Sequence, residues 1–484
     1  MYITIILAIP ALLSLGSIGV RSRKTFGIVN ACGYLAVLAS SVMLFKETIS
    51  SGCIKACNGF ICIDGLGAFF IFVISVVAFA AALYSIGYIN KDVSAGVISE
   101  RKARMYYLLF NLFCLSMIVV PSLNSLGMLW VAIEMTTLIS AFLVGFYNTK
   151  KSVEAAWKYI IICSVGIIFA LLGTILFYYA LSISGAAKSL NWSDMISAAG
   201  RMDRNILKVA FIFIIVGYGT KAGLAPMHTW LPDAYSQAVS PSALLSGVLL
   251  KISIYAILRF GIIVVKCVGF QYFGNLMILL GVISLVISCG FILVQKDLKR
   301  LLAYSSIEHI GIIAIGFGLG TTLGMAGALF HIFNHAVAKS SIFLGSSNVV
   351  RNYDKHNMND IRGVIEVMPF TGIMILLGVF ALTGFPPFSI FVSEIMIVIA
   401  AFLKGSYFVA GILLITLSII FGSFIYYFGK MLFDKGPKDM QKYGEPVSGK
   451  LALLFLSVPL CASGVLLPIF KKDLIWILQG LFQR

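Results

Sequence analysis

The sequence predicts an all-α, polytopic membrane protein of about 14 transmembrane helices, with two inverted five-helix repeats that each contain a broken helix. Three observations lead to this fold class. Of the 484 residues, 60% are hydrophobic and only 11% are charged, whereas soluble domains carry about 25% charged residues. Apolar segments long enough to cross a bilayer recur along the whole chain. Two of these segments are interrupted by glycine and proline, which disfavour continuous helix.

The segments between the predicted spans are too short to form soluble domains, so residues 1–484 are predicted to be a single membrane domain. In chain order, the spans cover about residues 3–20, 27–44, 65–89, 106–120, 126–147, 157–181, a broken span from 207, a span opened by Ser240-Pro241, 274–294, 301–319, 323–349, a broken span from 369, 406–428 and 451–470.

These spans group into blocks of three, five, five and one. Spans 1–3 occupy about residues 1–90, spans 4–8 about 105–264, spans 9–13 about 273–430, and span 14 with a short amphipathic tail about 451–484. The two five-span blocks are the predicted repeats, and each carries its broken helix as its fourth span. Because five is an odd number, the second copy is inverted in the membrane, as in many transporters.

The net charge of +17 is carried mostly by short loops between spans, which excludes nucleic acid as a partner. Lys and Arg follow spans 1, 3, 5, 9, 11 and 13, whereas the loops after spans 6 and 7 depart from this alternation. Because basic loops stay in the cytoplasm, both termini are predicted to lie outside a cell inner (cytoplasmic) membrane. The N-terminus has no basic region before its apolar run, so it is interpreted as a retained first span.

The chain shows no pattern for a metal or cofactor. Cys53, Cys57 and Cys62 share one loop, but no histidine lies near and the spacing matches no zinc motif. The remaining cysteines are scattered, and no glycine-rich dinucleotide turn follows a strand. We therefore expect no metal, no cofactor and no catalytic residue in this chain.

The two broken spans mark the predicted functional region. The first carries Lys221 and is interrupted by Gly223, Pro226 and Pro232, and the next span carries Lys251; the second is interrupted by Gly384, Pro386 and Pro387 and resumes through Glu394. A lysine at the centre of a membrane helix costs roughly 2.5–3.5 kcal/mol. Irregular backbone at that depth persists only where protein buries it or water fills a cavity. Movement of a small cation is the usual reason for such features.

Buried groups that can gain or lose a proton form a candidate translocation set: Glu134, Lys221, Lys251, His309, His335, Lys339 and Glu394. His331, His335 and Lys339 are spaced i, i+4, i+8, so they lie along one helix face. An inward-facing row of this kind is what a proton relay requires.

Structural interpretations of the same residues stay open at this point. Glu134 and Lys221 could form a static ion pair, and Lys251 and Lys339 could reach the membrane interface. His309, His331 and His335 could be packing histidines with satisfied nitrogens. Glu308 is adjacent to a histidine and so points elsewhere, which favours a structural role. His228 and Asp233 could satisfy backbone groups freed by the break.

Several motifs resemble the antiporter-like subunits of respiratory complex I, a family that includes Mrp-type sodium/proton antiporter subunits and membrane subunits of group 4 nickel–iron hydrogenases. The resemblance covers roughly residues 60–430. These motifs are KAGLAPMHTWLPDAYSQAVSPSALLSGVLLK (221–251), LWVAIEMTTLISAFLVGFY (129–147), AYSSIEHIGII (303–313), HIFNHAVAKSSIFL (331–344) and GFPPFSIFVSEIMIV (384–398). With AAWKYIIICSVGI (155–167), the 221–234 segment looks closest to component F of hydrogenase-4, as in formate hydrogenlyase-type complexes.

The resemblance implies a fourteen-helix fold with helices 7 and 12 broken, a Glu134–Lys221 pair, a lysine at Lys251, a histidine at His309 and an exit group at Glu394. Some family members have lysine at this last position. The chain stops soon after span 14, which argues against the distal complex I subunit with its long lateral helix.

We therefore predict a proton-translocating subunit, with sodium as an alternative ion, of a redox-driven oxidoreductase complex of the hydrogenase or NADH dehydrogenase type. Its predicted partners are other membrane subunits, the lipid bilayer and a peripheral redox arm with Fe–S clusters and NiFe or flavin. Three alternatives remain: a subunit of a multi-subunit Na⁺/H⁺ antiporter, an organic-anion carrier and an inert scaffold. A carrier needs an arginine in its cavity, and only Arg259 lies well inside a span, near its end.

Overall fold

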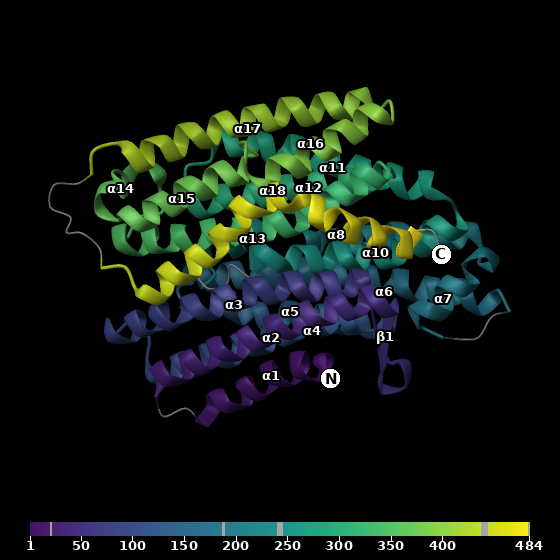
Figure 1. The fold of residues 1–484 in the computed structure, drawn as a ribbon, viewed down its shortest axis with the longest axis horizontal. Coiled ribbons are helices and arrows are strands. Elements are labelled where there is room, and N and C mark those ends of the chain that lie inside the picture. The colour runs from purple at the N-terminus through teal and green to yellow at the C-terminus, as the bar shows by residue number, and fades with distance from the viewer. Residues whose placement is uncertain (20–21, 186–188, 240–244, 437–443, 483–484) are drawn as a thin grey trace.

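The protein is an elongated bundle of packed helices in the computed structural model, which describes residues 1–19, 22–185, 189–239, 245–436 and 444–482 (Figure 1). Within these residues, 12 helices are long and apolar enough to cross a membrane. Two more elements join them: α13 (Thr322–Tyr353), which carries polar side chains, and α15 (Pro369–Leu382) with α16 (Ser389–Leu403), the halves of one interrupted span. The prediction of a polytopic all-α protein with about 14 spans is confirmed.

The N-terminal block forms one edge of the bundle (Figure 1). Its elements are α1 (Tyr2–Gly16), α2 (Arg23–Ser51), β1 (Cys53–Ala56), β2 (Ile61–Asp64) and α3 (Gly65–Ser94). The antiparallel β1–β2 hairpin was not predicted. Asp64 ends the hairpin and begins α3, because its carboxylate accepts a hydrogen bond from the Gly67 N–H at 2.9 Å.

The second block follows with five spans and two short helices. Its elements are α4 (Glu100–Val119), α5 (Leu126–Val144), α6 (Lys150–Ile183), α7 (Trp192–Ala198), α8 (Arg204–Ala222), α9 (Leu231–Gln237) and α10 (Leu250–Cys267). Most of the long helices begin at a capping side chain, as Ser125 does for α5 and Asp203 for α8. A π-helical turn, Leu245–Leu249, precedes α10, and the predicted start of this span at Ser240-Pro241 lies outside the described residues.

The third block extends to the opposite edge of the bundle (Figure 1). Its further elements are α11 (Phe270–Val294), α12 (Leu298–Gly318), α14 (Val364–Val367) and α17 (Tyr407–Phe433). The last block is the single span α18 (Val447–Phe482), which crosses the middle of the bundle in the view of Figure 1. The short amphipathic tail predicted after about residue 470 continues the last span, because α18 is one helix through Phe482. The fourth span of each five-span block is broken, as predicted.

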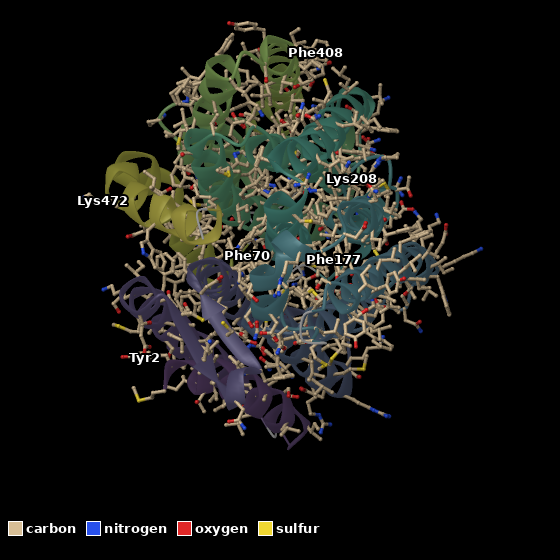
Figure 2. All side chains as sticks on the ribbon, turned by 90° about the vertical axis from the view of Figure 1, so that its right-hand side faces the viewer. Tyr2, Phe70, Phe177, Lys208, Phe408 and Lys472 are labelled. Atoms are coloured by element: carbon tan, nitrogen blue, oxygen red, sulfur yellow. The ribbon has the colours of Figure 1, made fainter. Side chains whose placement is uncertain are left out.

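Burial divides the helices into a centre and a periphery. The apolar windows of α10 and α12 are each 94% buried, whereas that of α17 is 33% buried. In the view along the bundle, Phe70 and Phe177 lie in the interior and Phe408 at the edge (Figure 2). Phe408 is 77% exposed, and many other large apolar side chains are exposed like it. Such a surface matches contact with lipid tails.

The connections group on two sides of the bundle. Isolated bridges join Ile61 to Leu123 and Ser125 to Asn191, which brings together the loops after spans 2, 4 and 6. Another bridge joins Asp297 to Asn357 and so the loops after spans 9 and 11. This grouping agrees with the predicted alternation, while the assignment of one side to the cytoplasm stays a prediction.

Candidate functional site

The first helix break lies between α8 and α9, inside the bundle. Gly223 ends α8 in the left-handed region, at φ 76° and ψ 22°, which glycine adopts without strain. The break frees backbone groups, and side chains satisfy them. The Trp230 Nε1–H donates to the Thr220 carbonyl at 2.8 Å, and the Ala225 N–H donates to the Ser284 hydroxyl at 2.9 Å. The irregular backbone is therefore held by protein contacts.

The two prolines of this region have different roles. Pro226 lies within the break, after a cis peptide bond. Pro232 lies in the first turn of α9. Pro232 thus lies at the far edge of the predicted break, where proline in the first turn of the next helix removes only an N–H that would have no partner there.

Lys221 and Glu134 meet through a third side chain. The fully buried Lys221 Nζ donates hydrogen bonds to the Ile133 carbonyl and the Thr137 hydroxyl. Thr137 in turn donates to Glu134 Oε2 at 3.1 Å, and Ser164 donates to Glu134 Oε1 at 3.1 Å. Among the described residues, no direct ion pair within 4.0 Å joins the lysine to the glutamate. Thr137 is a member of this group that the sequence analysis did not identify.

Lys251 lies beside the π-helical turn. It is fully buried, and its Nζ donates to the Ser246 carbonyl at 2.7 Å. The Ser246 hydroxyl contacts the Ser306 hydroxyl of α12 at 3.0 Å. Lys251 therefore faces the next block of the protein and does not reach the membrane interface. Short π-helical turns are frequent at functional sites.

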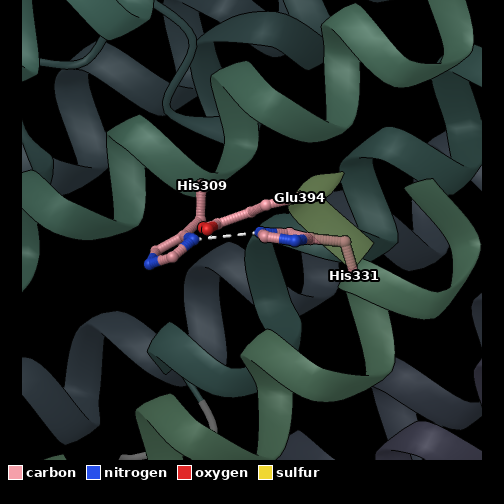
Figure 3. A group of neighbouring side chains, drawn as sticks. All are labelled: His309, His331 and Glu394. Atoms are coloured by element: carbon pink, nitrogen blue, oxygen red, sulfur yellow. Dashed lines mark hydrogen bonds between the residues drawn. The ribbon is translucent and has the colours of Figure 1, made fainter. Parts of the chain in front are cut away.

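Three histidines form a buried histidine cluster, His309 on α12 with His331 and His335 on α13. His309 Nδ1 and His331 Nε2 lie 3.0 Å apart and share a hydrogen bond (Figure 3). The rings of His309 and His335 stack with centroids 4.3 Å apart. No hydrogen bond is assigned to either ring nitrogen of His335. These nitrogens offer unused positions for a proton or a water molecule.

Glu394 completes this group from α16. It is 6% exposed, its Oε1 has no hydrogen-bond partner, and its side chain lies next to His309 and His331 (Figure 3). The neighbouring Ser393 hydroxyl contacts His331 Nδ1 at 2.9 Å. Gly384 of the second break packs directly on the Glu394 carboxylate, because a Cβ there would lie 2.0 Å from Oε2.

Lys339 and Glu308 adjoin the histidine cluster. Lys339 is fully buried on α13, and its Nζ donates to the Ser305 hydroxyl of α12. Glu308 is 3% exposed and interacts electrostatically with both Lys339 and Glu394. Glu308 therefore lies close enough to the site to interact with its charges, while the structural role expected for it stays a prediction. Glu308 could have been identified as part of the site from its position next to His309 in the AYSSIEHIGII motif.

The predicted residues thus form two groups. Lys251 joins the group that contains the histidine cluster, and a gap separates Lys221 from Lys251. Lys251 interacts electrostatically with His335 and with Lys339, so it belongs with the histidine cluster. Within the described part of the chain, no hydrogen bond joins Lys221 to Lys251. The first group contains Glu134, Thr137 and Lys221, and the second runs from Lys251 to Glu394.

A charged vestibule opens on the side of the odd-numbered loops. Its cavity has a volume of about 480 Å³ and is lined by residues that include Lys158, Asp233 and Arg300. Asp233, at the start of α9, pairs with Lys158 at 3.2 Å and with Arg300 at 2.6 Å. Asp233, for which a role in satisfying freed backbone groups was left open, thus takes part in an ion-pair network next to the broken helix.

One set of residues has donors for a cation. Ligand atoms of His309, His331 and Glu394 all lie within 4.8 Å of one another. The two imidazoles, however, already share a hydrogen bond, and the hard cation Na⁺ prefers oxygen ligands. The group suits proton exchange better than metal binding.

Arg259 offers no charge to a substrate. Its guanidinium binds both carboxylate oxygens of Asp64 at 2.6 Å and donates to the Tyr255 hydroxyl at 2.8 Å. It also lies over the Trp192 ring, 4.7 Å from the centroid. The buried arginine that an organic-anion carrier would need is therefore neutralised by the protein itself.

Comparison with known proteins decides the family. The family profile described as "NADH:quinone oxidoreductase/Mrp antiporter, TM" matches residues 123–420. The chain belongs to this family. All the groups described above, from Glu134 to Glu394, lie inside the matched region of this NADH:quinone oxidoreductase/Mrp antiporter family.

Individual relatives come from several kinds of complex. The chain is 36% identical to a hydrogenase-4 component F homolog of Methylacidiphilum infernorum over 375 residues, 77% of each protein. It is 29% identical to a Na⁺/H⁺ antiporter subunit of Alkalihalophilus pseudofirmus, over 78% of this chain and 76% of that one. The fold matches a chain of an archaeal membrane-bound sulfane sulfur reductase with a TM-score of 0.87 at 25% identity, covering 100% of this chain and 98% of the other. The protein is therefore an antiporter-like membrane subunit, as predicted from its motifs.

Proposed function

We propose that this chain translocates protons as a subunit of a redox-driven membrane complex of the membrane-bound hydrogenase/formate hydrogenlyase or NADH:quinone oxidoreductase type. The observation that carries this proposal is the buried series of titratable side chains from Lys251 through the histidine cluster to Glu394. Buried ionisable groups in a membrane bundle are costly and mark ion pathways. The relatives in hydrogenase-4 and in a respiratory membrane complex support the same assignment.

The proton path begins at the charged vestibule around Asp233, on the predicted cytoplasmic side. It continues to Lys221, crosses to Lys251, passes through His335 and His309, and leaves from Glu394. Water molecules complete the step between the two lysines, where no described side chain forms a direct link. The stacked and hydrogen-bonded histidines can pass a proton from ring to ring because each imidazole has two nitrogens.

The distance between a buried lysine and a nearby carboxylate controls whether the lysine holds or releases its proton. At an effective dielectric constant of about 20, an opposite charge attracts a lysine by about 4 kcal/mol at 4 Å and about 2 kcal/mol at 8 Å. A side-chain movement of that size therefore changes the proton affinity by more than tenfold. Glu134 can act in this way on Lys221 through Thr137, and Glu308 on Lys339.

The redox chemistry that drives transport is assigned to partner subunits. We propose a peripheral redox arm with Fe–S clusters and NiFe or flavin, bound together with other membrane subunits. This chain contributes the ion path in the cell inner membrane, with both termini outside.

A second candidate is a subunit of a multi-subunit Na⁺/H⁺ antiporter, which the relative from Alkalihalophilus pseudofirmus favours. The nitrogen-rich donor set around Glu394 argues for the proton as the ion moved. The two candidates differ in one measurement. Redox-driven proton uptake without added sodium supports the first, and uptake that needs a sodium gradient but no redox substrate supports the second.

The central experiment is redox-driven proton uptake by membrane vesicles that contain the assembled complex. We expect Lys221→Ala to lower uptake at least tenfold because it removes the first proton-binding group of the path. Lys208→Ala is the matched control, since Lys208 is exposed on the same helix. Unchanged uptake in an assembled Lys221→Ala complex would show that Glu134, Thr137 and Lys221 are structural, which is also what an inert scaffold requires.

A further inference from the structure

The β1–β2 hairpin brings two cysteine thiols into contact outside the membrane spans. In its register, Cys53 pairs with Asp64, and Cys62 precedes Asp64 by two residues. Because side chains alternate along a strand, both cysteines lie on the same face of the hairpin. Their sulfur atoms lie 2.7 Å apart, and both cysteines are reduced in the structure.

We propose that Cys53 and Cys62 are oxidised to an intrachain disulfide that closes this hairpin. A disulfide needs two thiols on facing backbone segments whose sulfurs can approach to about 2.05 Å. Here the sulfurs are already in contact, so closure requires a movement of less than about 1 Å and no change of register. Cys57, in the turn between the strands, is exposed and is not part of the pair.

The location of the hairpin favours oxidation. It follows the second span, so it lies on the side predicted to be outside the cell membrane, where disulfides form and persist. It is also accessible. A cavity of about 330 Å³ is lined by Cys53 and Cys62 together with Asp64 and Trp192. A small disulfide or the exposed active site of a disulfide-exchanging protein can therefore reach the sulfurs.

The charges around the pair favour Cys62 as the attacking thiol. The hydrogen bond from Cys53 lowers the pKa of Cys62 to about 7, and the positive charges of Arg259 and Lys55 act in the same direction, against burial and Asp64. The Cys62 thiolate attacks one sulfur of the oxidant's disulfide and releases one thiolate. The Cys53 sulfur then loses its proton to that thiolate and attacks the Cys62 sulfur of the mixed disulfide, which releases the second thiolate. This thiolate takes up from solvent the proton that Cys62 had lost. Two electrons pass to the oxidant.

The disulfide would hold the end of the hairpin against two helices that are distant in the sequence, α10 and α18. Asp64 ends the hairpin and binds Arg259 on α10, the helix that carries Lys251. The next residue, Gly65, packs on Trp476 of α18, because a Cβ there would lie 2.4 Å from the ring. A closed hairpin holds Asp64 against both neighbours at the outer end of the bundle.

Mass spectrometry of the complex from membranes of its native host tests the pairing. Free thiols are blocked with N-ethylmaleimide during lysis, and the chain is digested with trypsin without reduction. Lys55 lies between the two cysteines, so cleavage after it leaves two peptides that only a disulfide can join. We expect the joined pair in wild type and in Cys57→Ser, and its loss in Cys53→Ser and Cys62→Ser.

A membrane-impermeant maleimide applied to intact spheroplasts gives the second readout. We expect Cys62 in the Cys57→Ser protein to be labelled only after reduction, and to be labelled directly when Cys53→Ser is added. The proposal would be overturned if both thiols of wild type carry N-ethylmaleimide before reduction, or if the linked peptides disappear in Cys57→Ser. Both measurements are independent of whether the chain moves protons.

Discussion

At Glu394 the placement of one carboxylate depends on a residue that has no side chain. Gly384 lies at φ 64°, and its α-carbon faces the Glu394 carboxylate, which has no room for a further methyl group. The carboxylate therefore stays beside His309 and His331. The same principle applies at Thr137 and Ser393, where a small hydroxyl group orients a charged or titratable neighbour. A missing methyl group or one hydroxyl group can therefore decide whether buried titratable side chains lie close enough to form a proton path.

The variant Gly384→Ala tests this placement. We expect at least tenfold slower proton uptake with normal assembly, because the new methyl group displaces the Glu394 carboxylate from the histidine cluster. Gly405→Ala is the matched control. Gly405 has φ 74°, so alanine costs a similar roughly 1–2 kcal/mol of backbone strain there, but no heavy atom lies within 4 Å of the position that its methyl group would take. Equal uptake in the two variants would contradict the role assigned to Gly384.

Asp64 gives a pH-dependent prediction. Burial raises the pKa of its carboxyl group, but the Arg259 guanidinium and the Gly67 N–H outweigh burial and lower that pKa below its usual value. A lowered pKa in the folded state means that the charged carboxylate stabilises the protein above the unfolded-state pKa, and that this stability is lost as the pH falls through the folded-state value.

We expect Asp64→Asn to lower the free energy of unfolding by about 1.5–3 kcal/mol at pH 7, the range for hydrogen bonds to charged groups. The difference from wild type should shrink below about pH 4, the usual pKa range of aspartate. Thermal unfolding of the purified complex in detergent measures both effects. A difference that stays constant from pH 7 to the acid range would argue against the ion pair with Arg259 as its cause.

At the scale of elements, close helix contacts depend on small residues. On α11 and α12, Gly281 and Gly311 face each other, and a Cβ on either would lie within 2.8 Å of the other's carbonyl oxygen. Small residues let membrane helices approach closely. This contact fixes α12, and with it His309 and Glu308, against the neighbouring helix. The first broken helix is held in a different way, by side-chain hydrogen bonds to the backbone groups that the break leaves without helical partners.

A leucine at Gly281 should force α11 away from α12. We expect Gly281→Leu to lower the stability by about 1–3 kcal/mol, the usual cost of overpacking. Gly290→Leu is the control, because Gly290 lies on the same helix with no heavy atom within 4 Å of a Cβ. Thermal unfolding in detergent compares the two. A similar loss in both variants would show that leucine itself, and not the helix contact, is responsible.

At the scale of the whole molecule, the ion path crosses between two five-span blocks. The first block supplies Glu134, Lys221 and Lys251, and the second supplies the histidine cluster and Glu394. The connections of the bundle fall on two sides, with the charged vestibule on one and the β1–β2 hairpin on the other. Transport across the membrane therefore requires that these two sides face different compartments.

Labelling of single introduced cysteines tests this orientation. Val97 and Gly200 are exposed in loops that lie on opposite sides. In intact spheroplasts, we expect an impermeant maleimide to label Gly200→Cys and not Val97→Cys, because the basic loop after span 3 is predicted to be cytoplasmic. Wild type gives the background from native thiols. The opposite result would reverse the orientation and place the hairpin in the cytoplasm.

The sequence by itself determined the fold class, the number of spans, the two helix breaks and most of the titratable residues. It could do so because a membrane span must be apolar over about 20 residues, so every charge or proline inside one stands out. Lys221, Lys251 and Glu394 were identified for this reason. The position of Pro232 at the start of α9 was not predicted, because a single sequence does not show where a helix resumes after a break.

Only the tertiary structure decided which of these groups meet. Spacing along one helix placed His331 and His335 on a common face, but their contact with His309 depends on how α12 packs against α13. Thr137 joined Glu134 to Lys221, Glu308 came close enough to Lys339 to interact with its charge, and Cys53 contacted Cys62 across a hairpin that was not predicted. Burial is a local property that apolar sequence reveals, whereas contacts between distant segments depend on packing of the whole bundle.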